Sequence, residues 1–196
     1  FLEAAGEDVP DCMTGRSIVP LLVSSKSGTI DPTRDHVITG RERHVAKARA
    51  GNLPYPQRSI RTRDFLYIRN FAPDRWPMGT PTGMDDPARE PSFEKLEQNT
   101  FAAFGDLDAS PTKAWMVKHR RDPQWRMHWE LGFGKRPGEE LYDLRRDPDY
   151  LHNVADDPAY AQTRKELSQR LMDTLKATGD PRVLGDGKTF ERPPFV

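Results

Sequence analysis

The clearest pattern of apolar and polar positions lies near the end of the chain, from Pro158 to Thr178. Apolar residues recur there at the spacing of one helix face, with polar residues between them. Asp157 is a favourable N-cap and Pro158 suits a first helical position, whereas Gly179 and Pro181 end the pattern. The sequence therefore predicts a long helix with a packing stripe of Tyr160, Leu167, Leu171 and Leu175.

Alternating apolar and polar residues predict short strands upstream of this helix. The predicted strands are His36–Gly40, Gln57–Arg61, Phe65–Phe71 and Glu140–Leu144, and the middle two form a hairpin around a polar turn. Alternation places Leu66 and Ile68 on one face of the hairpin, and Phe65, Tyr67 and Arg69 on the other. We expect the long helix to pack on the face that carries Leu66 and Ile68.

The remaining segments read mostly as loops and short helices. Residues 71–97 are dense in Pro, Gly, Asp and Met and are expected to be irregular, too polar to build a core of their own. Ser110 and Pro111 predict a helix start, and the basic run 118–121 suits that helix's C-terminus. Because the chain starts with Phe1 in helical register and lacks an initiator Met, we expect the tail of a longer protein, with any leader outside it.

Composition narrows the partners of this 196-residue chain. Lys+Arg and Asp+Glu number 30 each, so no net field recruits nucleic acid or an anionic membrane surface. No apolar run approaches the ~18 residues of a transmembrane helix. The 18 prolines favour a loop-rich globular piece. A single cysteine, Cys12, leaves the redox compartment and the localisation undecided.

Several motifs resemble the sulfatase family. The stretch 139–158, EELYDLRRDPDYLHNVADDP, is similar to the segment that closes the sheet of sulfatases, although Asp149 stands displaced from the usual acidic position. The passage GRSIVPLL at 15–22 is similar to the one that joins the two sulfatase subdomains. Residues 55–60, 110–112 and 179–183 look closest to the heparan N-sulfatase (N-sulfoglucosamine sulfohydrolase)-like branch of the alkaline phosphatase superfamily.

The resemblance implies an α+β fold: a small four-stranded antiparallel sheet packed by a long C-terminal helix, with irregular Pro/Gly-rich loops. It also implies three parts. Residues 1–30 would be the end of a catalytic-half helix and the inter-subdomain linker, 31–180 the sulfatase C-terminal subdomain, and 181–196 an extended tail.

The resemblance implies that the catalytic chemistry lies outside this chain. Sulfatases carry formylglycine in a Cys/Ser-x-Pro-x-Arg motif, with calcium beside it. Only Cys12 and Arg16 match that spacing, but Thr14 and Gly15 depart from the motif, so we expect Cys12 to be an ordinary, partly buried thiol. The five histidines show no metal-binding spacing. We therefore expect no catalytic residue, no metal site and no cofactor here, calcium in the full-length enzyme, and no activity of this piece alone.

Two loops are the candidate substrate-binding positions. Arg41, Glu42, Arg43 and His44 follow a strand end, where donors, a carboxylate and a titratable ring come together. Asp106 and Asp108 precede the Ser110–Pro111 helix start and could contact sugar hydroxyls or a glucosaminium. The alternatives are a solvated polar loop for the first group and the acidic preference of a helix N-terminus for the second.

The function that the resemblance implies is the substrate-recognition part of a sulfatase. Its partners would be the catalytic N-terminal half of the same protein and a sulfated glycan of heparan type, cleaved at a sulfate ester or N-sulfo group. A periplasmic, secreted or lysosomal location would fit. The alternatives are a non-catalytic carbohydrate- or protein-binding module, or part of a related phosphodiesterase. Sugar, linkage and oligomeric state stay open.

Overall fold

The computed structural model describes residues 1–193 and divides into two compact units, residues 1–35 and the chain from His36 onward. The first unit contains two short helices, α1 (Leu2–Ala5) and α2 (Val19–Leu22). Its loops are tied together by Arg34, whose guanidinium donates to the Ser17 carbonyl at 2.6 Å. Cys12 is exposed, so the expectation of a partly buried thiol is wrong. The surrounding segment 6–17 has no regular structure that could cover it.

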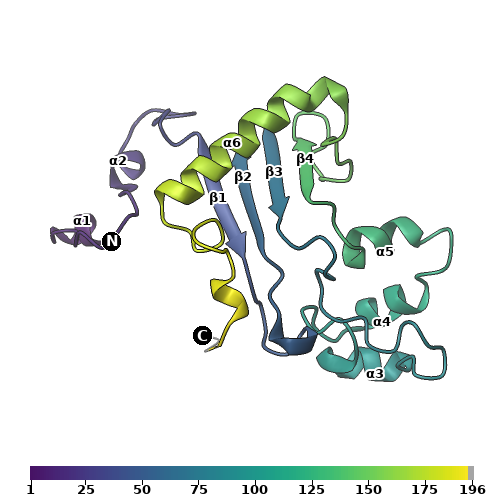
Figure 1. Ribbon diagram of the computed structural model, residues 1–196. Coiled ribbons are helices and arrows are strands. Elements are labelled where there is room, and N and C mark those ends of the chain that lie inside the picture. Colours follow the sequence, from purple (N-terminus) through teal and green to yellow (C-terminus); the bar gives the residue numbers. More distant parts are fainter. Residues whose placement is uncertain (194–196) are drawn as a thin grey trace. The chain divides into compact units, whose positions relative to one another are not determined.

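The second unit is built around a four-stranded antiparallel sheet in the order β1-β2-β3-β4 (Figure 1). The strands are β1 (His36–Arg41), β2 (Gln57–Thr62), β3 (Phe65–Asn70) and β4 (Glu139–Asp143). The register pairs Ile38 with Ile60, Ile60 with Tyr67, and Tyr67 with Leu141, which places one apolar row on a single face. The predicted α+β class and the four strands are confirmed.

The long helix α6 (Ala161–Ala177) lies across this row, as Figure 1 shows. A 3-10 turn, η3 (Pro158–Tyr160), leads into it, and the Asp157 carboxylate caps that turn by accepting from the Ala159 backbone N–H at 2.8 Å. The stripe predicted from the sequence faces the sheet. The resulting core contains Ile60, Tyr67, Leu141, Ala155, Leu167, Leu171 and Leu175.

The helix packs on the opposite face from the one we expected. Tyr67, rather than Leu66 and Ile68, meets α6, and its hydroxyl donates to Ser168 Oγ of that helix at 3.0 Å. The alternation itself was read correctly, but hydropathy favoured two aliphatic side chains over a tyrosine. A buried tyrosine contributes a large apolar ring and needs a partner for its hydroxyl, which α6 and Glu139 provide. Leu66 and Ile68 are half-buried on the other face of the sheet.

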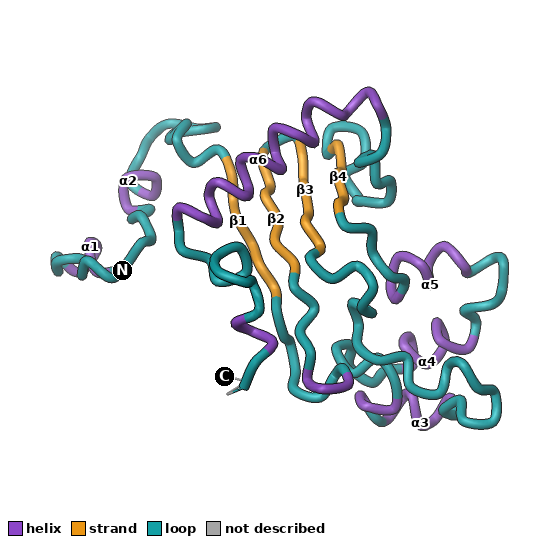
Figure 2. Tube along the Cα trace, viewed as in Figure 1, coloured by secondary structure: helices purple, strands orange, loops and turns teal. Residues whose placement is uncertain are grey.

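A second hydrophobic core lies at the other end of the same unit, around the helices α3 (Phe93–Gln98), α4 (Pro111–Lys118) and α5 (Arg126–Phe133). The 3-10 turns η1 (Ala50–Asn52), η2 (Thr100–Ala102) and η4 (Thr189–Glu191) complete the regular structure. Figure 2 shows how much of the rest is loop. Ser110 caps α4 as predicted, its hydroxyl accepting from the Lys113 N–H at 3.1 Å. No helix among the described residues is long and apolar enough to span a membrane.

The segment 71–97 contributes to this second core, which the sequence analysis missed. It adds Leu96, fully buried, and Trp76, Met78 and Met84, which pack around the cluster. The buried members from later in the chain are Ala102, Ala103, Phe104, Ala114, Val117 and Phe133. The apolar residues of 71–97 are isolated in the sequence, so no periodicity marks them. They become a core only when α4 and α5 supply the other side.

A lysine lies inside the second core. The Lys113 side chain is fully buried, and its ammonium donates to the carbonyls of Thr100, Phe104 and Leu107 at 2.9, 3.2 and 2.7 Å. Burial lowers the pKa of Lys113 to about 8, and Asp108 opposes that change. Three carbonyls match the three N–H donors of an ammonium, so this charge cross-links the loop that precedes α4.

The basic run after α4 closes the loop of residues 85–91 onto the helix. Arg120 donates to both oxygens of Glu90 at 3.1 and 2.6 Å, and Lys118 pairs with the same carboxylate at 2.9 Å. Hydrogen bonds from Arg120 and then Lys118 lower the pKa of Glu90 to about 2. The ion pairs add a tertiary contact to the helix-dipole role expected from the sequence.

Removing a leucine from the α6 stripe is expected to weaken the fold. Leu171→Ala removes a fully buried side chain between helix and sheet, so the free energy of unfolding should fall by about 2–5 kcal/mol. Chemical denaturation measures this change. Lys165→Ala, on the exposed side of the same helix, should stay within about 0.5 kcal/mol of wild type. An unchanged midpoint for Leu171→Ala would mean that α6 is not docked.

The Glu90 ion pairs should make stability depend on pH. Since the folded state lowers this pKa from 4.5 to about 2, the carboxylate stabilises the fold fully above pH ~4.5 and loses this contribution as the pH falls toward 2. The expected size is on the order of 1–3 kcal/mol. The difference in unfolding free energy between wild type and Glu90→Gln should therefore shrink as acid is added. Glu94→Gln, at an exposed carboxylate, should show a much smaller dependence, and a Glu90 difference independent of pH would refute this assignment.

Candidate functional site

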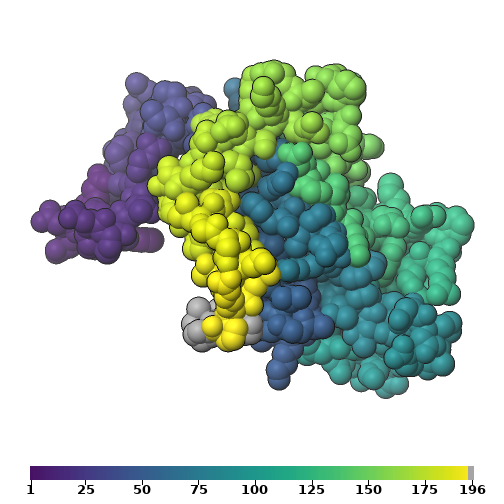
Figure 3. Space-filling model, in the orientation of Figure 1, coloured from purple at the N-terminus to yellow at the C-terminus, as the bar shows by residue number. Residues whose placement is uncertain are grey.

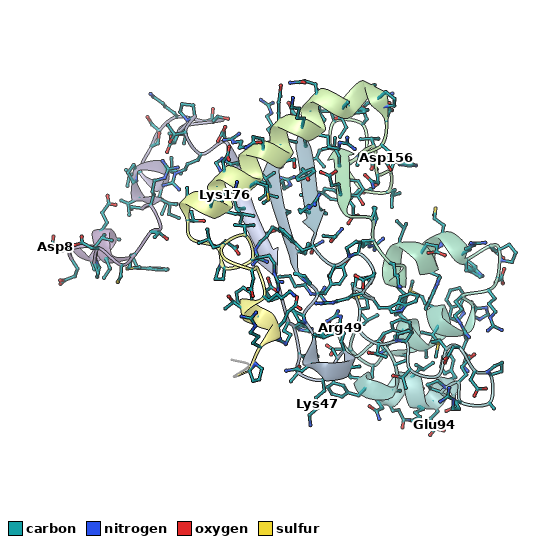
Figure 4. All side chains as sticks on the ribbon, viewed as in Figure 1. Asp8, Lys47, Arg49, Glu94, Asp156 and Lys176 are labelled. Atoms are coloured by element: carbon teal, nitrogen blue, oxygen red, sulfur yellow. The ribbon has the colours of Figure 1, made fainter. Side chains whose placement is uncertain are left out.

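The loop after β1 is held in a closed conformation by its own backbone and side chains. Arg43 Nε donates to the Asn52 carbonyl at 2.7 Å, and Asn52 Oδ1 accepts from the Lys47 N–H at 2.9 Å. The Tyr55 N–H donates to the Glu42 carbonyl at 2.7 Å, which closes the base. Figure 4 shows Lys47 at the outer tip of this loop, whereas Arg49 is directed into the protein. The candidates Glu42, Arg43 and His44 therefore lie on a loop that internal hydrogen bonds hold in place.

A buried carboxylate joins this loop to the second core. The Asp106 side chain has no exposed surface and pairs with Arg41 at 2.8 Å and with Arg49 at 2.5 Å. The Arg41 and Arg49 guanidiniums also donate to the Pro77 carbonyl. Burial lowers the pKa of Arg49 below its usual value, and Asp106 opposes that change. Of the predicted site residues, Arg41 and Asp106 are thus brought into direct contact.

Glu42 lies in a second ion-pair cluster, with the C-terminal segment. Arg58 contacts Glu42 at 2.9 Å and donates twice to Asp180, at 2.6 and 3.0 Å. Arg182 also pairs with Glu42, and with Glu191 at 3.0 Å. Although burial opposes it, the hydrogen bond from Arg58 lowers the pKa of Asp180. Figure 3 shows this C-terminal segment, in yellow, lying against the blue residues of the β1–β2 region.

Glycine at position 40 makes room for this cluster. A Cβ built on Gly40 would lie 2.8 Å from Cδ of the Arg58 side chain, closer than such contacts occur. Arg58 is itself almost fully buried and crosses the strand end to reach Glu42 and Asp180. The glycine that ends the predicted first strand is therefore a packing requirement of the buried arginine.

The other predicted residues differ in exposure. Arg43 is half-buried and also donates to the Phe190 carbonyl, so it links the loop to the C-terminal segment. His44 and Asp108 are exposed. Among the predicted residues, His44 and Asp108 are therefore the ones that a ligand reaches without displacing an ion pair.

A cavity of about 500 Å³ opens beside the loop and is called here the β1-loop cavity. Its walls include Lys47, Asn52, Thr80, Phe101 and Phe104. Lys47, Asn52 and Phe104 have left-handed backbones, with φ of 65°, 54° and 50°, and they are three of the four such non-glycine residues in the described part of the chain. Backbone strain of this kind concentrates at functional sites.

Sequence reasoning missed much of this site. Lys47, Arg49, Asn52, Arg58 and Arg182 were not singled out, although Gly51-Asn52 is a turn signal that indicates the left-handed backbone. The Arg58–Asp180 and Arg182–Glu42 ion pairs connect positions more than a hundred residues apart, and no local pattern reveals them.

Residues 1–193 do not provide a fit for the calcium ion that the family resemblance implies. No group of three or more His, Cys, Asp or Glu side chains is arranged there to hold a metal ion. The buried carboxylates of the site, Asp106 and Glu42, are already paired with arginines. They therefore lack the free oxygen ligands that calcium needs.

Neutralising Asp106 should destabilise the fold, because two arginines then lose their buried counter-ion. Asp106→Asn leaves Arg41 and Arg49 close together without the anion between them, so the free energy of unfolding should fall by about 3–5 kcal/mol. Asp108→Asn, two residues away and exposed, should change it by less than about 0.5 kcal/mol. Both values come from denaturant titration. Equal effects of the two variants would contradict a structural role confined to Asp106.

Comparison with known proteins agrees with the motifs. No protein-family model matches the chain. An ulvan-active sulfatase of Formosa agariphila is 28% identical over 92% of this chain and 28% of its own length. The human N-sulphoglucosamine sulphohydrolase is 29% identical over 91% of this chain and 29% of its own length. A solved structure of a 2-O GAG sulfatase shares 18% identity, covers 93% of this chain and 24% of that chain, and gives a TM-score of 0.47.

The chain spans somewhat more than a quarter of the length of the curated relatives it matches. The recognition of sulfatase motifs in the sequence is confirmed. Sulfatase homologues cover most of this chain, and the chain matches only part of each of them.

Proposed function

We propose that this chain is the C-terminal, substrate-recognition part of a sulfatase that acts on sulfated saccharides. One observation carries the proposal: more than nine-tenths of the chain is similar to proteins named for ulvan and for N-sulphoglucosamine. The second name describes a sugar with an N-sulfo group. A glycan of heparan type, cleaved at an N-sulfo group or a sulfate ester, is therefore the proposed substrate of the whole protein.

The β1-loop cavity and two exposed residues outside its lining, His44 and Asp108, supply the recognition groups in this proposal. A sulfated sugar is an anion with hydroxyls, and it needs cationic and neutral hydrogen-bond donors. Lys47 supplies an exposed ammonium, Thr80 a hydroxyl, and His44 a ring that donates when protonated. Asp108 offers a free acceptor for sugar hydroxyls. Arg41, Glu42 and Asp106 contribute by holding the loop in place, because their charges are paired within the protein.

The catalytic half of the same protein is the proposed partner. It would contribute the nucleophile and the calcium ion, as the sulfatase resemblance implies, since Thr14 and Gly15 depart from the nucleophile motif around Cys12. By this proposal residues 1–196 alone do not release sulfate from any substrate.

The proposal predicts a loss specific to the glycan. In the full-length protein, His44→Ala should lower kcat/KM for a sulfated oligosaccharide by about 10–100-fold, the range expected when charge-assisted hydrogen bonds are lost. Arg43→Ala should lower it as well, but this variant also breaks the contact with the Asn52 carbonyl, so His44 gives the cleaner test. Sulfate release is the measurement. A small aryl sulfate, which does not reach the loop, should react nearly as before.

Three outcomes would contradict parts of this proposal. Equal losses on both substrates would assign the loop a structural role. No loss on either would leave it as a solvated loop. Glycan binding by the full-length protein without any sulfate release would favour the alternative, a non-catalytic carbohydrate-binding module.

A further inference from the structure

The largest of the cavities described here lies apart from the predicted site, on the second core. It measures about 730 Å³ and lies between the loop of residues 80–89, the connection that follows α4, and α5. We call it the tryptophan groove, after Trp76 and Trp129 in its walls. It shares Thr80, Thr82 and Phe104 with the β1-loop cavity, so the two adjoin.

The aromatic wall of the groove is fixed in place. Trp129 stacks on Phe133 with ring centroids 4.6 Å apart and 14° between the planes, and it meets the edge of Phe104 at 5.5 Å. Trp76 meets Phe104 edge-on at 6.0 Å. Both indoles are only half-buried, so part of each lines the groove. Rigid, partly exposed aromatic rings present an apolar surface on which the C–H face of a sugar ring can pack.

Three arginines and Asp85 line the groove, and one of the arginines has no partner among the described residues. Arg120 is neutralised by Glu90, and Arg89 pairs with Asp86 at 2.9 Å. Arg121 is exposed and has no hydrogen-bond or ion-pair partner anywhere in residues 1–193. Its guanidinium is a planar fork that matches the oxygens of a sulfate or carboxylate.

The loop on the other side of the groove is ordered without a ligand. Gly83 has a φ of 75°, and a Cβ there would lie 2.4 Å from the Arg89 carbonyl oxygen, so only glycine permits this turn. Asp86 accepts from the Ala88 N–H at 3.0 Å, which fixes the tip. A formed groove loses little conformational entropy on binding.

We propose that the tryptophan groove binds an anionic saccharide: the sugar ring packs on Trp129 and Trp76, and a sulfate or carboxylate pairs with Arg121. The pairing of an aromatic wall with a free guanidinium selects a ligand that is both ring-shaped and charged. Neither feature depends on hydrolysis, so the groove binds such a saccharide whether or not the protein is a sulfatase.

Binding is tested by calorimetry with a heparin hexasaccharide. An N-acetylated hexasaccharide without sulfate groups is the comparison ligand. Arg121→Ala should weaken binding of the heparin fragment by about tenfold, and Arg121→Lys by less, because lysine keeps the charge but loses the fork. Arg126→Ala is the matched control: this exposed cation lies on α5 outside the groove, and its removal should change the Kd less than about twofold. The unsulfated hexasaccharide should bind more weakly and lose less affinity on Arg121→Ala, because only its carboxylates remain to pair with the guanidinium.

The aromatic half of the proposal has its own test. Trp129→Phe keeps a ring stacked on Phe133 but reduces the apolar wall, so binding of both hexasaccharides should weaken. Circular dichroism and the denaturation midpoint verify that each variant is folded. The mass of the oligosaccharide after titration separates binding from hydrolysis.

The proposal fails if Arg121→Ala and Arg126→Ala weaken binding equally, since that result indicates charge attraction over the whole surface. It fails as well if Trp129→Phe has no effect, or if polyglutamate binds as tightly as heparin and with the same dependence on Arg121, because then the ligand is an acidic peptide. Failure here leaves the sulfate-release assay of the whole protein untouched, so the two proposals are judged separately.

Discussion

The buried Asp106 carboxylate is the contact on which the arrangement of the second unit depends. A charge without solvent exposure is tolerated only when it is paired and hydrogen-bonded. Asp106 meets this condition because it forms ion pairs with Arg41 at the end of β1 and with Arg49 in the loop that follows. The two arginines in turn donate to the Pro77 carbonyl of the second core. The sheet end, the candidate loop and the second core are therefore positioned by the same three charges.

The fold was predictable where a local pattern carried the information. The α6 stripe, the Asp157 and Ser110 caps and the hairpin alternation are each contained within a few residues, and the structure has them as expected. The face of the sheet that α6 covers was not predictable in this way. It depends on the hydrogen bond from the Tyr67 hydroxyl to Ser168, about a hundred residues later in α6. A hydropathy pattern contains no information about this contact.

The candidate site shows the same division. The position of its loop after a strand end was predictable, because strand and turn residues mark it. The roles of Arg41, Glu42 and Asp106 were predicted as ligand contacts, but in the structure their charges are taken by partners distant in sequence. Residue type alone cannot distinguish a charged side chain that is available to a ligand from one that is paired within the protein. The two proposals therefore assign recognition to exposed groups: His44, Lys47, Asp108 and Arg121.

The Glu42–Arg182 pair has a consequence for how sequences of this kind vary. One residue follows the first strand and the other follows the last helix, yet both are almost buried and share their hydrogen bonds with Arg58, Asp180 and Glu191. Replacing either residue alone leaves the other as an unpaired, almost buried charge. The residue at position 42 therefore limits which residues position 182 can carry, and the reverse. Among homologues, substitutions at position 42 should therefore be accompanied by substitutions at position 182, and a chimaera that exchanges only one end of this chain joins mismatched charges at the base of the candidate site.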